Sequence, residues 1–134
     1  MTLAQQLATL PGFRWAAGMR VLAASDTDAD TDSPPINTVV DTRDGTVTVA
    51  WSTFAGTAEG GTLLRDDVPD LADNATGGVL LGWLASMGMQ PTADCDAGRW
   101  DVGAGKPTEW RWHGPSATLG EACAKALIAL GRAS

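Results

Sequence analysis

The chain has 134 residues, of which 44% are hydrophobic, and this suits a single folded domain, residues 1–134, with a sizeable core. Its formal net charge of −7 would repel a phosphate backbone, so we expect no direct nucleic-acid binding. We find neither the basic and apolar segments of a signal peptide nor an apolar run near the ~20 residues that a membrane helix needs, which predicts a cytoplasmic protein, not secreted and without membrane contact.

The N-terminal part is predicted to form a short helix and then a strand. Residues 2–10 place three leucines on one helical stripe, and Thr2 with Gln5 has the spacing of a capping box. Residues 18–24 alternate between apolar and other side chains, which is typical of a strand.

An acidic loop is predicted at residues 25–35, and we expect it to be exposed because it combines four aspartates with two prolines. The aspartates occupy the first, third, fifth and seventh places of a calcium-binding loop. However, Thr31 and Asn37 stand where that loop needs Gly and Glu, so we predict no metal site. The loop is instead a candidate binding surface, formed by Asp26, Asp28, Asp30 and Asp32.

A β-hairpin is predicted next, because residues 36–41 and 46–51 are rich in β-branched side chains. They flank Asp44-Gly45, a dipeptide that suits a two-residue hairpin turn. The small, Gly-rich residues 54–61 predict a loop, and residues 62–65 predict a short strand or one turn.

The central helix is predicted over residues 73–88 and should be buried around most of its circumference. Asp73 or Asn74 would cap its start, and Gly88 would end it in the left-handed conformation. Its apolar residues leave almost no polar face, which also allows a homodimer. Three internal glycines each cost roughly 1 kcal/mol relative to alanine, and close backbone approach to a neighbour would offset that cost. They are Gly77, Gly78 and Gly82.

The C-terminal part predicts a loop at residues 91–97, then a second hairpin from residues 99–102 and 109–112. A last helix starts at Thr118, which has capping-box spacing with Glu121. The predicted order is α-β-β-β-α-β-β-α, an α+β fold with a single layer of helices packed on a largely antiparallel sheet.

Two blocks of the sequence carry a resemblance. The first is Leu10-Pro-Gly-Phe-Arg-Trp15 followed by Gly18-Met19, and the second runs from Pro69-Asp-Leu-Ala-Asp-Asn-Ala-Thr-Gly77 into Leu80-Leu81. With the Trp-containing hairpin and the Ala-rich last helix, these blocks resemble a family of small proteins encoded by bacteriophages and prophages. The resemblance implies that origin and this order of elements, and it carries over no catalytic residue.

The aromatic side chains are unusual, with six Trp and no Tyr. Trp110 and Trp112 are two residues apart on a predicted strand, so they would share a face, and Trp100 could pair across from them. We expect a core layer. The alternative is an exposed aromatic patch, which would mark a binding surface or a dimer seam.

His113 is the only histidine and therefore the first candidate for acid–base catalysis. Ser116, Asp101 and Glu109 are its candidate partners, but no nucleophile elbow or triad signature surrounds them. We expect His113 to end a strand and meet water. Gly103-Ala-Gly-Lys106 lacks the spacing of a phosphate loop, which favours a turn between strands.

Together these features predict a small acidic phage or prophage accessory protein that binds a host or phage protein without catalysis and without a cofactor. One version is inhibition of a host defence complex, because an acidic surface can imitate nucleic acid toward a basic groove. The alternative is a role in virion assembly or structure, and a second alternative is a small enzyme using His113 with a nearby carboxylate. The candidate binding residues are Trp100, Trp110, Trp112 and the four loop aspartates.

Overall fold

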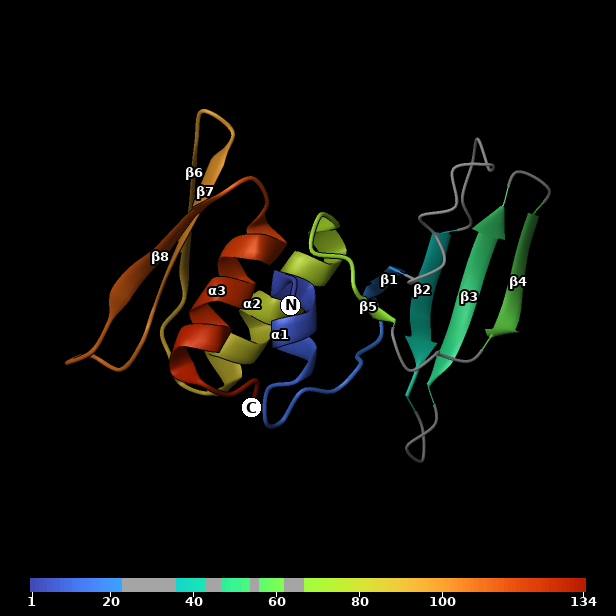
Figure 1. Cartoon of the computed structure of the whole chain (residues 1–134), viewed down its shortest axis with the longest axis horizontal. Coiled ribbons are helices and arrows are strands. Elements are labelled where there is room, and N and C mark those ends of the chain that lie inside the picture. Colours follow the sequence, from blue (N-terminus) through green and yellow to red (C-terminus); the bar gives the residue numbers. More distant parts are fainter. Residues whose placement is uncertain (23–35, 43–46, 54–55, 62–66) are drawn as a thin grey trace. The chain divides into compact units, whose positions relative to one another are not determined.

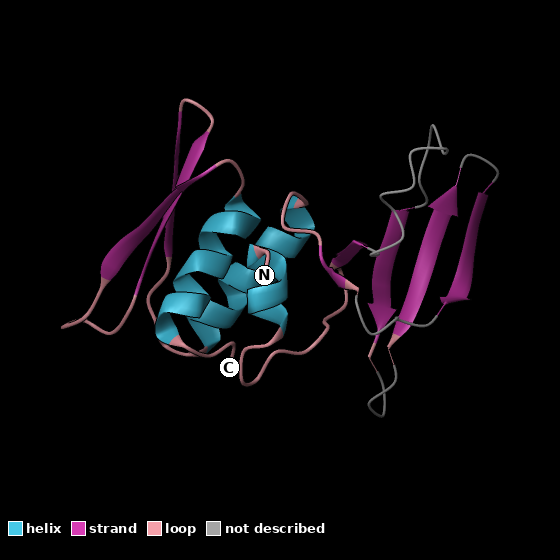
Figure 2. Ribbon diagram, in the orientation of Figure 1, coloured by secondary structure: helices cyan, strands magenta, loops and turns pink. Residues whose placement is uncertain are grey.

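The computed structural model of the chain describes residues 1–22, 36–42, 47–53, 56–61 and 67–134. The chain divides into two compact units, shown in Figures 1 and 2. The smaller unit comprises residues 15–70, and the larger comprises residues 1–14 with 71–134. The single domain expected from the chain length stays a prediction.

The smaller unit is a five-stranded antiparallel sheet in the order β4-β3-β2-β1-β5 (Figure 1). Its strands are β1 (Arg20–Leu22), β2 (Ile36–Asp41), β3 (Thr48–Thr53), β4 (Gly56–Gly61) and β5 (Val68–Pro69). The buried side chains include Val39 and Val49, which lie opposite each other on β2 and β3. Cross-strand pairs of β-branched residues stabilise a sheet in this way.

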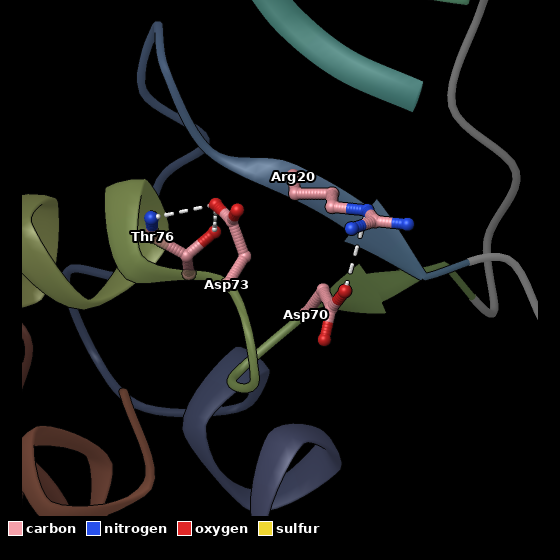
Figure 3. A network of polar contacts seen from close by, with 4 residues as sticks. All are labelled: Arg20, Asp70, Asp73 and Thr76. Carbon is pink, nitrogen blue, oxygen red and sulfur yellow. Dashed lines mark hydrogen bonds and ion pairs between the residues drawn. The ribbon is translucent and has the colours of Figure 1, made fainter. Parts of the chain in front are cut away.

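The pairing of β1 with β5 is reinforced by one ion pair. Arg20 Nε lies 3.4 Å from Asp70 Oδ2, as Figure 3 shows, and the Asp70 N–H donates to the Arg20 carbonyl at 2.8 Å. Both side chains are partly exposed, so the pair contributes little beyond fixing the two strand ends.

The predicted first hairpin is confirmed, since β2 pairs antiparallel with β3. Its turn, the acidic loop at 25–35 and residues 62–65 lie outside the described residues. The predicted loop at residues 54–61 is wrong, because Gly56–Gly61 forms β4 along the edge of β3. A Gly-rich stretch has weak strand propensity of its own, and the backbone ladder to β3 overrides it.

The larger unit packs three helices and a three-stranded antiparallel sheet (Figure 2). Helix α3 contacts α1 and α2 on one side and strands β7 and β8 on the other, so it lies between the sheet and the other helices. The elements are α1 (Leu3–Ala8), α2 (Asn74–Ser86), β6 (Thr92–Asp96), β7 (Arg99–Ala104), β8 (Arg111–Ser116) and α3 (Leu119–Leu130).

The α+β class and the predicted succession of helices and strands are confirmed, with the strands divided between two sheets. The loop predicted at residues 91–97 is wrong, because Thr92–Asp96 forms β6. It pairs with β7 through a two-residue turn at Ala97 and Gly98, whose φ angles are 52° and 76°. Such a turn is usually marked by Asn-Gly or Asp-Gly, so Ala-Gly gave no signal.

Helix α2 begins as predicted, with Asp73 as its cap. The Asp73 carboxylate accepts hydrogen bonds from the Thr76 N–H at 2.9 Å and the Thr76 hydroxyl at 3.0 Å (Figure 3). Gly88 follows the helix with φ 74°, as expected for a left-handed end. Trp83 is buried at 5% exposure, in edge-to-face contact with Phe13 at 5.7 Å and beneath the Arg14 guanidinium at 5.5 Å.

The prediction that α2 is buried around most of its circumference is wrong. Gly78 and Gly82 are exposed, and a β-carbon on either would meet nothing within 4 Å. At Gly77 the predicted close approach does occur, because a β-carbon there would lie 3.0 Å from the Gly120 nitrogen of α3. Small residues form an exposed face of α2, Leu80, Trp83 and Leu84 are buried, and Val79 and Leu81 are half-buried. A homodimer stays a prediction.

Candidate functional site

The candidate site is the face of the β6-β7-β8 sheet that α3 does not cover, which we call the outer face. The covered face carries Val102 and Ala104, both buried under α3. The next residue, Gly103, points the other way and pairs with Trp112 of β8 and Thr92 of β6. The outer face therefore combines one row from each strand, and its main side chains are Asp94, Asp96, Asp101, Trp110 and Trp112.

Two tryptophans form the aromatic half of the outer face. The rings of Trp110 and Trp112 meet edge to face, with centroids 5.0 Å apart and planes at 76°. Trp110 is held in place because its Nε1–H donates to the Gln90 carbonyl at 3.0 Å and its ring lies against Gly103. Trp112 rests on this fixed ring and remains 51% exposed, so the pair displays a large aromatic surface to solvent.

The expected core layer of tryptophans is therefore wrong for Trp112, which is exposed, whereas the predicted shared face of Trp110 and Trp112 is confirmed. Trp100 does not pair across from them. Its cross-strand partners are Cys95 and Ser116, which places it with Val102 on the opposite face. The register shift between Trp100 and Val102 is a bulge, which the sequence did not indicate.

Carboxylates form the other half of the outer face. Asp94 lies directly opposite Asp101, and Asp96 lies opposite Arg99 at the turn. Within the described residues, none of the three carboxylates is in an ion pair. Directly opposed like charges destabilise a sheet, so the Asp94–Asp101 pair works against folding while it concentrates negative charge. Asp94 and Asp96 are not among the predicted site residues, because the sequence predicts a loop where β6 lies; Asp101 is predicted as a partner of His113 and instead lies on the outer face.

The four aspartates of the predicted acidic loop, Asp26, Asp28, Asp30 and Asp32, lie outside the described residues. Among the residues that are described, no group of three or more His, Cys, Asp or Glu side chains is placed to hold a metal ion. The described helices include none that is long and apolar enough to cross a membrane.

His113 lies on the covered face and lines a cavity of about 160 Å³ at the end of α3. Of its three candidate partners, only Glu109 lines the same cavity, together with Arg111. Burial and the Arg111 charge lower the pKa of His113, although a hydrogen bond to the Ala104 backbone acts in the opposite direction. The imidazole is therefore neutral near pH 7. Its Nε2 is buried and has no hydrogen-bond partner in the described part of the chain.

The cavity around His113 contains no nucleophile among the residues that line it: Ala104, Glu109, Arg111, His113, Ala129 and Leu130. Cys123, the buried cysteine, is also inert, because burial raises the pKa of its thiol to about 12. These groups provide acid–base chemistry at most.

The sequence and fold were compared with known proteins. No protein-family model matches the chain, and neither a curated protein nor a solved structure matches it.

Proposed function

We propose that this protein acts by binding another protein, without catalysis, and that the outer face of β6-β7-β8 is the binding surface. The observation that carries the proposal is Trp112, a large aromatic side chain held exposed on a fixed Trp110. Exposed aromatic residues are typical of the energetic centres of protein interfaces. The chain has six tryptophans, and one of them, Trp83, is buried in the core. The fold can therefore enclose a tryptophan, and Trp112 nevertheless stays exposed.

The charge of the surface selects the kind of partner. Asp94, Asp96 and Asp101 follow the tryptophans along the outer face toward the β6–β7 turn, where Arg99 also lies. The three carboxylates outnumber that cation, and the whole chain carries −7. A partner that contacts both parts of the surface must offer an apolar pocket flanked by Lys or Arg. We propose a basic protein, met in the cytoplasm of a host cell.

The biological setting follows from the resemblance to phage and prophage proteins, which we extend to this chain as part of the proposal. A basic groove that normally holds nucleic acid fits the acidic surface, so inhibition of a host defence complex is the leading version. A basic virion protein is the other partner of the same chemistry, which would make this chain an assembly or structural factor.

The test is capture of the partner from host lysate by the tagged protein, compared between two matched variants. Trp112→Ala removes the exposed ring and should abolish capture, whereas Val40→Ala truncates an exposed apolar residue elsewhere, 41% exposed, and should leave capture intact. Equal capture by both variants would contradict a binding role for the outer face. Repeating the capture in high salt tests the charged half, because salt screens exposed charge pairs.

The acidic loop provides a second comparison. Replacing Asp26, Asp28, Asp30 and Asp32 by Asn removes its charge and changes no residue of the outer face. If this variant loses the partner and the Trp112→Ala variant keeps it, the loop is the binding surface and the assignment to the sheet is wrong.

The second candidate function is enzymatic, and one observation favours it: His113 and Glu109 line the same cavity. Without a nucleophile there, the chemistry would be proton transfer between a carboxylate and a neutral imidazole. Conversion of a small metabolite from host extract by the wild-type protein, absent in His113→Gln, would establish this function. An unchanged metabolite profile would exclude it for that extract.

A further inference from the structure

Strand β6 has an open edge. Among the described strands it pairs only with β7, and all five of its residues, Thr92–Asp96, are exposed. Helix α3 packs on β7 and β8 and leaves β6 beyond its cover. An edge strand presents a row of unpaired N–H and C=O groups, and an extended segment of another protein can pair with them.

The side chains of β6 alternate between the two faces. Asp94 and Asp96 lie on the outer face, where the next strand inward places Asp101 and Arg99 opposite them. Cys95 lies between them on the other face, opposite the half-buried ring of Trp100. A strand added to β6 would therefore meet the carboxylates of Asp94 and Asp96 on one face. On the other face it would meet the small side chain of Cys95, which lies opposite Trp100.

We propose that the partner adds an extended, cationic segment to β6 as a fourth strand. The segment would place Lys or Arg opposite Asp94 and Asp96 and an apolar residue opposite Cys95, on the face that carries Trp100 two strands away. This pattern, cation–apolar–cation, is symmetric about Cys95, so it fits an added strand running in either direction. The inference rests on the proposed function, in which the partner is basic, and it adds the conformation and the sequence pattern of the bound segment.

A second copy of this chain does not fit the same edge. Full antiparallel overlap of β6 with itself would set Asp94 opposite Asp94, and a register centred on Cys95 would set Asp94 opposite Asp96. A register centred on Ala93 would extend the overlap to Pro91, which has no N–H to donate. The two carboxylates therefore oppose self-association and favour a cationic strand.

The first test uses the peptide Thr-Lys-Val-Lys-Thr, with blocked ends, titrated into the labelled protein. Amide hydrogen exchange within Thr92–Asp96, followed by NMR, should slow on binding at the alternate residues whose N–H groups point away from β7, because these become paired. Two matched peptides provide controls: Thr-Lys-Val-Lys-Thr N-methylated at every residue keeps the side chains but cannot donate a backbone hydrogen bond, and Thr-Glu-Val-Glu-Thr reverses the charge. Equal protection by the N-methylated peptide would contradict strand addition and leave only charge attraction.

A matched pair of variants tests the charge pattern. Asp94→Asn combined with Asp96→Asn should weaken binding of the lysine peptide roughly tenfold, since two cross-strand charge pairs are lost. Glu121→Gln removes one partly exposed carboxylate outside β6, keeps an oxygen that can accept the Ala117 N–H, and should leave the affinity unchanged. A similar loss in both variants would contradict the assignment to β6.

Cys95 permits a direct test of register. Cys95 is exposed, whereas the chain's other cysteine, Cys123, is buried. A thiol peptide should therefore react with Cys95 selectively. The peptide Thr-Lys-Cys-Lys-Thr should form a mixed disulfide with Cys95 under mild oxidation faster than the shifted peptide Cys-Lys-Thr-Lys-Thr. Equal rates for the two peptides would contradict the register.

The outcome separates this inference from the proposed function. If the peptides do not protect β6 while Trp112→Ala still abolishes capture of the natural partner, strand addition is wrong and the outer face stands. If the lysine peptide protects β6 and Trp112→Ala has no effect on capture, strand addition stands and the role of the tryptophans is wrong.

Discussion

Helix α3 covers one face of the β6-β7-β8 sheet and leaves the other open, and the two faces are built from different kinds of side chain. On the covered face, Val102 and Ala104 are 0% and 1% exposed. On the outer face, the same sheet carries Trp112, at 51% exposure, and the opposed carboxylates Asp94 and Asp101. The difference shows that the outer face is not optimised for stability, because exposed Trp and opposed Asp pairs add little or cost free energy.

The largest expected difference is between two tryptophans. Trp83→Ala should lower the free energy of unfolding by roughly 3–5 kcal/mol, because it empties a buried site against Phe13. Trp112→Ala should lower it by about 1 kcal/mol, since only the edge contact with Trp110 is lost. Denaturant unfolding of both variants measures the difference, and equal losses would show that Trp112 belongs to the core.

Two glycines give the next largest effects, with opposite signs. Gly120→Ala should destabilise the protein by about 1–3 kcal/mol, because its β-carbon would collide with the Leu71 carbonyl. Gly82→Ala should stabilise it by up to about 1 kcal/mol, because that glycine is helical, exposed and has open space around it. Thermal unfolding should move the two midpoints in opposite directions; a rise of both would contradict the close packing of Gly120 on Leu71, and a fall of both would contradict the open surroundings of Gly82.

A substitution on the outer face should change the free energy of unfolding less than the glycine substitutions do. Asp94→Asn should stabilise the fold by about 0.2–1 kcal/mol, because it removes the repulsion with the opposed Asp101. The same substitution should weaken binding of the basic partner. If Asp94→Asn lowers stability instead, the carboxylate has a structural role and the comparison between the faces fails.

The smallest effect concerns pH. The folded pKa of His113 is lowered, so the unfolded chain takes up a proton more readily and stability falls as pH drops below the unfolded pKa near 6.5. Above that pH the contribution of His113 is fully present. His113→Gln should flatten the stability profile between about pH 7.5 and pH 5.5. An unchanged slope would show that the imidazole is not desolvated by folding.

Much of the fold could be predicted from local signals. The Asp73 and Thr118 caps, the left-handed Gly88 and Gly131, and the β2-β3 hairpin each depend on a few adjacent residues, and the structure contains all of them. Strands β4 and β6 could not be predicted, because they have little apolar alternation and exist through pairing with a neighbour. Long-range pairing of this kind leaves only a weak trace in a single sequence.

The candidate site was predicted in part. The shared face of Trp110 and Trp112 follows from their spacing, but their exposure depends on which face α3 covers, and spacing cannot supply that. Asp94 and Asp96 do have the alternation of a strand face. The residues that alternate with them, Ala93 and Cys95, are small, so the apolar half of the pattern is too weak to distinguish a strand from a loop.

The role of the outer face in binding is best tested by the affinity of the captured partner for Trp112→Ala, with the free energy of unfolding measured on the same sample. We predict a loss of affinity of at least about tenfold with a stability loss of only about 1 kcal/mol, because the ring serves binding more than folding. Unchanged affinity in a folded variant would contradict the assignment of the outer face as the binding surface.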